Sequence, residues 1–493
     1  MRRLLPPLFG CLLPVGVLAW GLRRVLPTLG SGLWGPANPF RNGDFNGGWW
    51  LWWASHEARG GDPGWARLDW PGGVSSLAGV IPNPVDMLVL GWIGPPTVLG
   101  WNGVQLVHLV CALVATVVLA RAAGASWWAA GAATSLLAAS PVLLHEVAGG
   151  RPSNLIVWPG LLALAALLKG RGLAAGLLAA LQGVAYAWHG LVLLIVGLPL
   201  IRSLRTAGVA AVVGGVAVAP YVAWLVGGLG DVPTDTPQVG YTHLPGAGLF
   251  GLESVPPRFR VHPLLLGAAL LGLGRGRRLA LAGALGLALA LGPQLEWTLG
   301  HAQGTGPFAW LQWALPPVNR MHHPLRAVLL ALPLVCAAIA VGLTWIRGGR
   351  VLAAALVVAA CWVDKPMDEA TTYDQPAQPD FSELAAPGEG PVVDLLGMHH
   401  RTALALQTVH GRPLLEPLWF QRPGDGVQGG VDRFVRTGQA PPGLWQALAD
   451  RGFEQVWLLD RFGRARDLAP QLEAALGPPV VPGVYALPSA HQE

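Results

Sequence analysis

The chain has 493 residues, of which 53% are hydrophobic and only 12% are charged, and its mean hydropathy of +0.47 is too high for a soluble globular protein. A pI near 9.3 could suggest nucleic-acid binding. The basic residues, however, are scattered between apolar segments and form no aromatic-interleaved patch, so no nucleic-acid partner is expected. The four cysteines lie in apolar segments without CxxC spacing, so they are interpreted as small core residues, and neither a disulfide framework nor a zinc site is indicated.

The charge balance divides the chain into two parts. Residues 1–363 contain 22 basic and 10 acidic residues, a net charge of +12, whereas residues 364–493 contain 10 and 17, a net charge of −7. We therefore predict a mainly α-helical, polytopic membrane domain over 1–363, a linker over 364–390, and a small α/β domain over 391–493.

Eleven apolar segments are candidate transmembrane helices, since a span needs roughly 20 apolar residues. The first resembles a signal peptide but has no small-x-small cleavage motif after it, so it is interpreted as an uncleaved span. The segments are 4–24, 96–120, 125–143, 154–168, 172–187, 189–201, 207–227, 262–274, 279–293, 325–345 and 350–363.

The flanking charges predict the orientation of these spans. With the N-terminus in the cytoplasm, all ten acidic residues before Asp364 fall on the outer side, and none lies at a cytoplasmic end. The positive-inside rule supports this arrangement. An odd number of spans then places the C-terminal domain outside a bacterial inner membrane. The basic residues at the cytoplasmic ends are Arg2, Arg3, Arg121, Lys169, Arg171, Arg202, Arg205, Arg275, Arg277, Arg278, Arg347 and Arg350.

The first outer loop, over about 25–95, is long, polar and rich in tryptophan. A helix is predicted near 47–59, and its tryptophans fall on one face that would rest in the membrane interface. Just before it, Asp44 lies in a Gly-rich stretch, where Asp is typically a cap or turn residue. The alternative is a general base held near the bilayer, where a lipid-linked donor meets an acceptor hydroxyl.

The second outer loop carries His145 and Glu146 at the end of an apolar segment. A carboxylate at the mouth of a helix bundle is costly unless it is paired or hydrated. Glu146 and Arg151 could form a simple ion pair at the helix end. Alternatively, Glu146 could lie beside Asp44 and bind a metal or a sugar hydroxyl, with Arg151 on a phosphate.

A cationic cluster precedes the tenth segment, on the side where positive charge is scarce. It could anchor lipid head groups, or it could hold a polyprenyl phosphate, because arginine suits phosphate oxygens. Tyr241, His243 and His189 are weaker candidates. No HExxH or similar metal-ligand spacing is present, so the metal stays unassigned. The cluster comprises Arg320, His322, His323 and Arg326.

The C-terminal domain contains three strand-like runs, at 391–396, 454–460 and 483–487. Helical patterns occur near 400–409, 442–451 and 465–475. The segment 411–440 is rich in Gly and Pro and is expected to be irregular. This domain could bind a protein partner.

Several short motifs together resemble bacterial polytopic membrane proteins of the GT-C glycosyltransferase superfamily. The similarity covers nearly the whole chain, although each motif is short. The motifs are Gly43-Asp44 before the tryptophans, Asp69-Trp-Pro-Gly72, Trp101-Asn102, SPVLLHEVAGG (140–150), LGPQL (291–295), LPPVNRMHHPLR (315–326), VVDLL (392–396) and RTALALQTVHGRPL (401–414).

The resemblance implies a GT-C fold, a polyprenyl-phosphate-linked sugar as donor, a glycan, lipid or protein acceptor, and inverting transfer on the outer face. The family's catalytic carboxylate maps onto Asp44 and its second-loop acidic position onto Glu146. Asp44 has no second acid beside it, so the paired-carboxylate form of the motif is absent.

The predicted function is therefore transfer of a sugar with Asp44 as the base. Two alternatives stay open: an inactive GT-C-like scaffold, and a lipid or solute transporter. The chain has no Walker A, GxSxG or GxGxxG motif and no charged residue in the middle of a span, which disfavours ATP-driven pumps, lipases and proton-coupled carriers.

Overall fold

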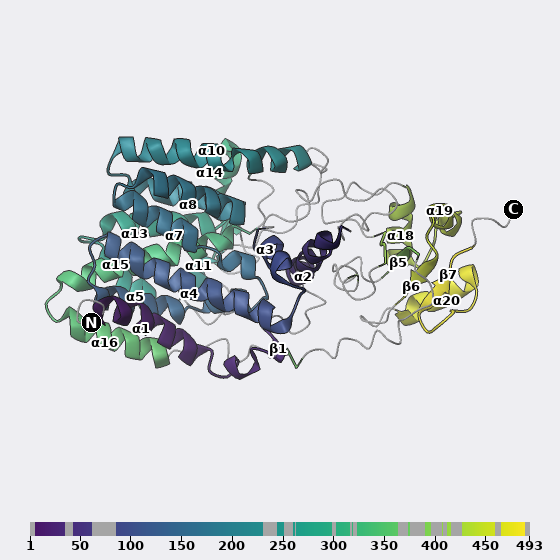
Figure 1. Cartoon of the computed structure of the whole chain (residues 1–493), viewed down its shortest axis with the longest axis horizontal. Coiled ribbons are helices and arrows are strands. Elements are labelled where there is room, and N and C mark those ends of the chain that lie inside the picture. The colour runs from purple at the N-terminus through teal and green to yellow at the C-terminus, as the bar shows by residue number, and fades with distance from the viewer. Residues whose placement is uncertain are drawn as a thin grey trace. The chain divides into compact units, whose positions relative to one another are not determined.

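The chain forms two compact units in the computed structural model. Unit 1 comprises Met1–Ala37, Val98–Val222 and Gln238–Tyr373, and unit 2 comprises Asn38–Thr97, Ala223–Pro237 and Asp374–Glu493. Figure 1 labels the elements of both. The structure describes residues 5–34, 43–61, 85–229, 244–250, 260–261, 263–297, 302–315, 318, 323–362, 373–374, 390–395, 407, 412–415, 426–458 and 465–488.

All eleven apolar segments form helices, as the sequence predicted. Proline and glycine break some segments into pieces, and short 3-10 helices continue several of them: η6 (Pro152–Leu155), η7 (Leu198–Leu200), η9 (Leu270–Gly272) and η11 (Pro324–Ala327). The α-helices are α1 (Leu5–Gly21), α4 (Val98–Ala122), α5 (Trp127–Ala138), α6 (Pro141–Ala148), α7 (Trp158–Leu168), α8 (Gly172–Ala185), α9 (Ala187–Gly197), α10 (Leu204–Leu229), α12 (Pro263–Ala269), α13 (Arg277–Ala290), α15 (Val328–Trp345) and α16 (Gly349–Trp362).

Unit 1 also contains small elements that the sequence patterns did not indicate. Strands β2 and β3 pair in antiparallel register after α13. These elements are η1 (Leu26–Thr28), β1 (Gly32–Leu33), α11 (Gly246–Leu249), β2 (Gln294–Glu296), β3 (Ala302–Thr305) and α14 (Pro307–Ala314); β4 (Tyr373–Asp374) falls at the boundary between the units.

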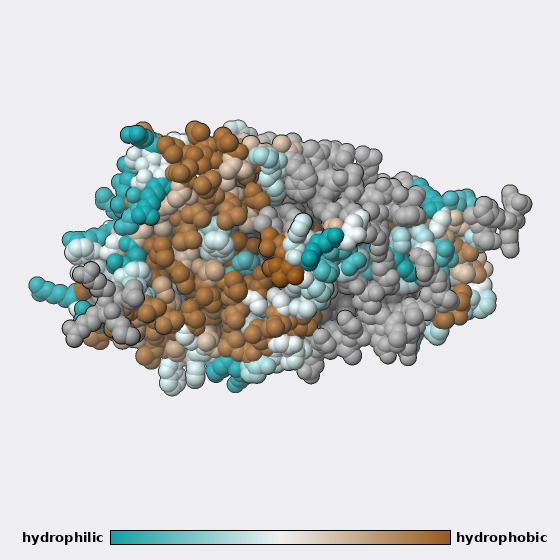
Figure 2. Space-filling view, in the orientation of Figure 1, coloured by the Kyte–Doolittle hydropathy of each residue, from teal (hydrophilic) through white to brown (hydrophobic). Residues whose placement is uncertain are grey.

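Three of the described helical stretches are long and apolar enough to cross a membrane: Val98–Ala122, Leu204–Ala223 and Pro324–Trp345. A fourth is added if α5 and α6, which meet at a bend of 59°, are counted as one span. The remaining apolar helices are shorter, so the total of eleven spans stays a prediction. The face of unit 1 that Figure 2 shows is broadly hydrophobic, as a lipid-facing surface would be.

The centre of unit 1 is α15, whose residues from Val328 to Leu343 are all buried. Helices pack closely around it because small residues lie where they cross. At the α1–α5 crossing, a Cβ on Gly10 would lie 2.8 Å from the Trp127 carbonyl oxygen, and one on Gly131 would lie 2.7 Å from the Gly10 carbonyl oxygen. Larger residues there would separate the two helices.

Asn102, near the start of α4, fixes the segment that follows α1. Its Oδ1 accepts a hydrogen bond of 2.8 Å from the Trp34 amide, and its Nδ2 donates to the carbonyl oxygens of Leu29 and Gly32 at 2.9 and 2.6 Å. Asn102 is fully buried, so these bonds satisfy a polar side chain that would otherwise be costly in an apolar helix bundle.

In unit 2, the C-terminal residues form a three-stranded sheet with the order β5-β6-β7. The strands are β5 (Val392–Asp394), β6 (Gln455–Trp457) and β7 (Val484–Ala486), with β5–β6 parallel and β6–β7 antiparallel. Each falls within a predicted strand-like run. Helices α19 (Leu444–Asp450) and α20 (Ala465–Leu476) are also where they were predicted.

The prediction that 411–440 is irregular is wrong for its second half, because α18 (Gly426–Thr437) is a helix. Val431, Phe434 and Val435 recur at helical spacing and are buried in the core of this sheet domain. Their burial outweighs the low helix propensity of the neighbouring glycines. Of the helix predicted near 400–409, only Gln407 lies within the described residues.

Arg412 joins the segment before α18 to the sheet. It is 6% exposed; its Nε donates to the Gly390 carbonyl oxygen at 2.6 Å, and its Nη1 donates to Gln455 Oε1 at 2.8 Å. Burial lowers the pKa of Arg412, and the Glu454 carboxylate, 3.5 Å from Nη2, opposes that shift. Arg412 lies in the segment 401–414, which is one of the motifs that resemble the GT-C superfamily.

The tryptophan-rich helix of the first loop is present as α2 (Gly43–Glu57), followed by a short turn of helix, η3 (Ala58–Gly60). Three of the tryptophans that were predicted to rest in the membrane interface, Trp50, Trp52 and Trp53, are instead buried in the protein. Trp50 is fully buried and donates from Nε1 to Gln407 Oε1 at 2.7 Å, and Trp52 donates to the Gly94 carbonyl oxygen at 2.7 Å. Both are therefore anchored within unit 2.

Helix α3 (Val85–Ile93) packs directly on α2. Gly91 makes this possible, because a Cβ there would lie 2.4 Å from Ser55 Cβ. The Gly91 carbonyl oxygen is also 3.2 Å from His56 Nδ1. The close approach fixes the position of α2, which carries Asp44 in its first turn.

Candidate functional site

Glu146 is a buried carboxylate near the end of α6, with 3% of its surface exposed. Asn154, also 3% exposed, donates from Nδ2 to Glu146 Oε2 at 2.7 Å. Arg151 Nη1 lies 3.8 Å from the same oxygen. Among the described residues these contacts both fall on Oε2, which leaves Oε1 able to accept a hydrogen bond from another molecule.

The backbone that builds this cluster is a Schellman turn at the end of α6. The Arg151 amide donates to the Glu146 carbonyl oxygen at 3.1 Å, and the Gly150 amide donates to the Val147 carbonyl oxygen at 2.9 Å. The turn requires a left-handed residue, which is Gly150 with φ of +61°. It reverses the chain into η6, and this reversal places Arg151 and Asn154 over Glu146.

The ion pair in this cluster is weaker than the amide hydrogen bond. The Arg151 side chain is 29% exposed and 3.8 Å away, so water screens much of the attraction. The Asn154 bond is short and sheltered from water, and a hydrogen bond to a charged group is worth about 1.5–3 kcal/mol. Asn154 therefore does most to keep the Glu146 carboxylate in place.

A second polar cluster contains Arg326, Tyr186 and His189. Arg326, in η11, is 8% exposed and donates from Nη1 to the Tyr186 hydroxyl. Tyr186 lies in the extended junction between α8 and α9, and the His189 ring meets it edge-on at 4.4 Å between centroids. His189 is fully buried, so this cluster brings a cation and two aromatic polar groups into an apolar bundle.

Gln182, fully buried near the end of α8, links the elements that carry the two clusters. Its Nε2 donates to the Ile156 carbonyl oxygen at 2.6 Å, and its Oε1 accepts from the Gly160 amide at 3.0 Å. Ile156 follows η6, and Tyr186 is one helical turn beyond Gln182, where its amide bonds the Gln182 carbonyl oxygen at 2.8 Å. Both clusters therefore lie at the same end of unit 1.

The described residues place the remaining candidates as follows. His145 is partly exposed on α6, beside Glu146, and His323 is partly exposed just before η11. Asp44 belongs to α2 of unit 2, and its side chain is outside the described set. The pairing of Asp44 with Glu146 therefore stays a prediction. Four further candidates lie outside the described residues: Arg320, His322, Tyr241 and His243.

Sequence reasoning missed Asn154, Tyr186 and Gln182. Gln182 had a readable signal, since an amide inside an apolar helix must find partners. Asn154 and Tyr186 had none, because a single amide or phenol between apolar segments has no diagnostic spacing. Among the described residues, no group of three His, Cys, Asp or Glu side chains could hold a metal ion.

Comparison with known proteins gives a relationship at the level of the fold. No protein-family model and no curated protein matches the chain. The cryo-EM structure of the arabinofuranosyltransferase AftD from Mycobacteria is similar, with a TM-score of 0.54 and 16% sequence identity over 92% of this chain. This chain spans 36% of the length of that protein.

The chain therefore shares a fold with part of that protein, and this fold is mainly helical, with apolar helices suited to a membrane. The likeness concerns the fold alone. At 16% identity it does not assign an activity to the chain.

Proposed function

We propose that the protein is a membrane glycosyltransferase that takes a sugar from a polyprenyl-phosphate donor. The observation that carries the proposal is the buried Glu146 carboxylate, held by Asn154 at 2.7 Å, at the same end of unit 1 as the buried Arg326. Ionisable groups buried in an apolar helix bundle are costly and typically mark a functional site. The glycosyltransferase-like fold supports the same reaction class.

The two clusters suit the two ends of a sugar phosphate. Glu146 Oε1 would accept a hydrogen bond from a sugar hydroxyl and orient the ring. Arg326, oriented by the Tyr186 hydroxyl, and Arg151 would stabilise the negative charge that grows on the departing phosphate. His145, His323, Arg320 and His322 are proposed to border the donor from the same loops, and Tyr241 and His243 from the loop after α10.

In the proposed reaction, Asp44 acts as the general base. An acceptor hydroxyl oxygen attacks the anomeric carbon of the sugar while the bond from that carbon to the phosphate oxygen breaks. The hydroxyl proton passes to the Asp44 carboxylate, and the bonding pair leaves with the polyprenyl phosphate. Attack opposite to the leaving group inverts the anomeric configuration.

The localisation proposed with this function is a bacterial inner membrane, with the N-terminus in the cytoplasm and the C-terminal domain outside. The acceptor would be a glycan, and a protein partner could bind the C-terminal domain. The arabinofuranosyl group is the first sugar to test, because the similar protein is an arabinofuranosyltransferase.

The test is a transfer assay with purified protein in nanodiscs, radiolabelled polyprenyl-phosphate sugars and a panel of oligosaccharide acceptors. We expect Asp44→Asn to lose transfer by a factor of about 100 or more, as general-base removal does. Glu57→Gln is the matched control, since Glu57 lies on the same helix, α2, and should retain activity.

Three results would contradict the proposal. Asp44→Asn with undiminished transfer would exclude Asp44 as the base. A folded wild-type protein that transfers no sugar from any donor would favour a scaffold, and one that moves intact donor between leaflets without transfer would favour a transporter.

A further inference from the structure

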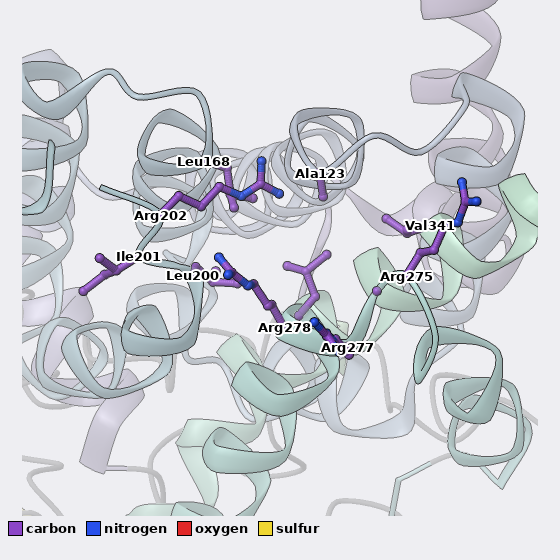
Figure 3. Close-up of a pocket in the computed structure, with 11 residues that line it drawn as sticks. Ala123, Leu168, Leu200, Ile201, Arg202, Arg275, Arg277, Arg278 and Val341 are labelled. Carbon is purple, nitrogen blue, oxygen red and sulfur yellow. The ribbon is translucent and has the colours of Figure 1, made fainter. Parts of the chain in front are cut away.

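A pocket lined by four arginines lies at the end of unit 1 away from Glu146. Its volume is about 520 Å³, within the range of small-molecule sites. The arginines are Arg202, which precedes α10, and Arg275, Arg277 and Arg278, which lie at the turn into α13. In Figure 3, Arg202 and Arg278 extend into the space beside Leu168 and Leu200, and Arg275 turns away from them.

The direction of the helices places this pocket opposite the Glu146 end. Helix α15 begins at η11, which carries Arg326, and its residue Val341 lines the pocket. Fifteen residues separate Arg326 from Val341, which is about 20 Å along a helix. The pocket is therefore distinct from the candidate sugar-transfer site.

The charge in the pocket is uncompensated in the described structure. The acidic residues of unit 1 within the described ranges are Glu146 and Glu296, and neither lines the pocket. Arg277 and Arg278 also occupy the first turn of α13, where the helix dipole disfavours cations. A bound anion would relieve both the mutual repulsion of the arginines and the unfavourable dipole interaction.

The turn that carries these arginines is held firmly. A Cβ on Gly276 would lie 2.7 Å from the Ala338 carbonyl oxygen, and one on Gly342 would lie 2.1 Å from the Leu271 carbonyl oxygen. The guanidinium carbon of Arg275 lies 3.5 Å from the ring centroid of Trp345. The backbone before α13 thus packs tightly on α15, which fixes the positions from which the exposed arginine side chains extend.

We propose that this pocket binds the phosphate head group of an anionic membrane lipid. Arginine forks match phosphate oxygens, and basic pockets between membrane helices are suited to anionic head groups. Leucines that lie within a few residues of Arg202 and Arg275 in the chain are exposed, and acyl chains could lie on them: Leu198 is 62% exposed, Leu204 84% and Leu273 60%. A lipid would contact both the arginines and this apolar surface, whereas a soluble phosphate would contact only the arginines.

The positive-inside rule alone would place arginines at the cytoplasmic ends of the helices, but it would not gather them in one pocket. The test therefore compares two double variants with the same change of charge. Arg202→Gln with Arg278→Gln removes two pocket arginines, and Arg171→Gln with Arg347→Gln removes two exposed arginines that do not line the pocket.

The measurement is binding of dioleoyl phosphatidylglycerol to the full chain in detergent, by native mass spectrometry, with dioleoyl phosphatidylcholine and inorganic diphosphate as comparison ligands. We expect phosphatidylglycerol to bind more tightly than either, and the pocket double variant to weaken it about 10-fold or more through loss of two charge-assisted contacts. The control double variant should change binding less than about twofold.

Three results would overturn the inference: equal binding of both lipids, an unchanged affinity in the pocket variant, or equal losses in the two double variants. Diphosphate binding as tightly as phosphatidylglycerol would assign the pocket to a soluble anion instead. The inference does not depend on sugar transfer, so it can fail or hold independently of the proposed function.

Discussion

Asn154→Ala tests the buried anchor of Glu146. The substitution removes the amide that donates to Oε2 at 2.7 Å and leaves a carboxylate that is 3% exposed. A buried charged group that loses its hydrogen bond costs about 1.5–3 kcal/mol. Arg151 is 3.8 Å away with a side chain 29% exposed, so its attraction offsets little of this loss.

We expect Asn154→Ala to lower the free energy of unfolding by about 2 kcal/mol, and Arg151→Ala to lower it by about 1 kcal/mol or less, in line with their burial. In a Glu146→Gln background the cost of Asn154→Ala should fall by about 1 kcal/mol, because the partner is no longer charged.

The assay is equilibrium unfolding of the full chain in mixed micelles, with the wild type and all the variants in one detergent. A double-mutant cycle then isolates the coupling between Asn154 and Glu146. Additive effects, or a larger loss with Arg151→Ala than with Asn154→Ala, would refute the argument that the amide rather than the ion pair holds the carboxylate.

Three further predictions follow from particular contacts. Gly91→Ala should destabilise unit 2 by about 1–3 kcal/mol, because the added Cβ would lie 2.4 Å from Ser55 Cβ. The loss should appear as faster hydrogen exchange in α2 and α3, and unchanged exchange would contradict this close packing. Arg412→Met should destabilise the sheet domain by about 2 kcal/mol in thermal unfolding, because it removes buried hydrogen bonds. Arg436→Met, which removes an exposed ion pair with Asp432, should cost less than about 1 kcal/mol, and equal costs would refute the role of burial. Arg326→Lys should reduce sugar transfer more than Tyr186→Phe does, because lysine lacks the planar fork that binds phosphate, and the reverse order would contradict that role.

The sequence predicted the helical segments well because apolar composition is a local property. Each apolar segment is helical, and the three strand-like runs contain β5, β6 and β7. Helix α18 was missed because its glycines masked the spacing of Val431, Phe434 and Val435. The number of membrane spans is harder to predict, because it depends on the lengths of the helices, and breaks at proline and glycine shorten them.

Contacts between residues far apart in the chain were beyond sequence reasoning for a physical reason. Trp50 binds Gln407, which is 357 residues away, and Arg326 binds Tyr186, which is 140 residues away. No local pattern encodes such pairs. Glu146 could be singled out because a carboxylate among apolar residues is unusual by itself, whereas its partner Asn154 became evident only through the turn at Gly150.

The central claim is that the chain transfers a sugar from a lipid-linked donor. Its most direct test is the stoichiometry and stereochemistry of a single turnover, measured with a polyprenyl-phosphate arabinofuranose donor and an oligosaccharide acceptor. The account predicts one polyprenyl phosphate released for each sugar transferred, with the anomeric configuration inverted in the product and both events lost in Asp44→Asn. Donor that stays intact, or a transferred sugar with retained configuration, would contradict it.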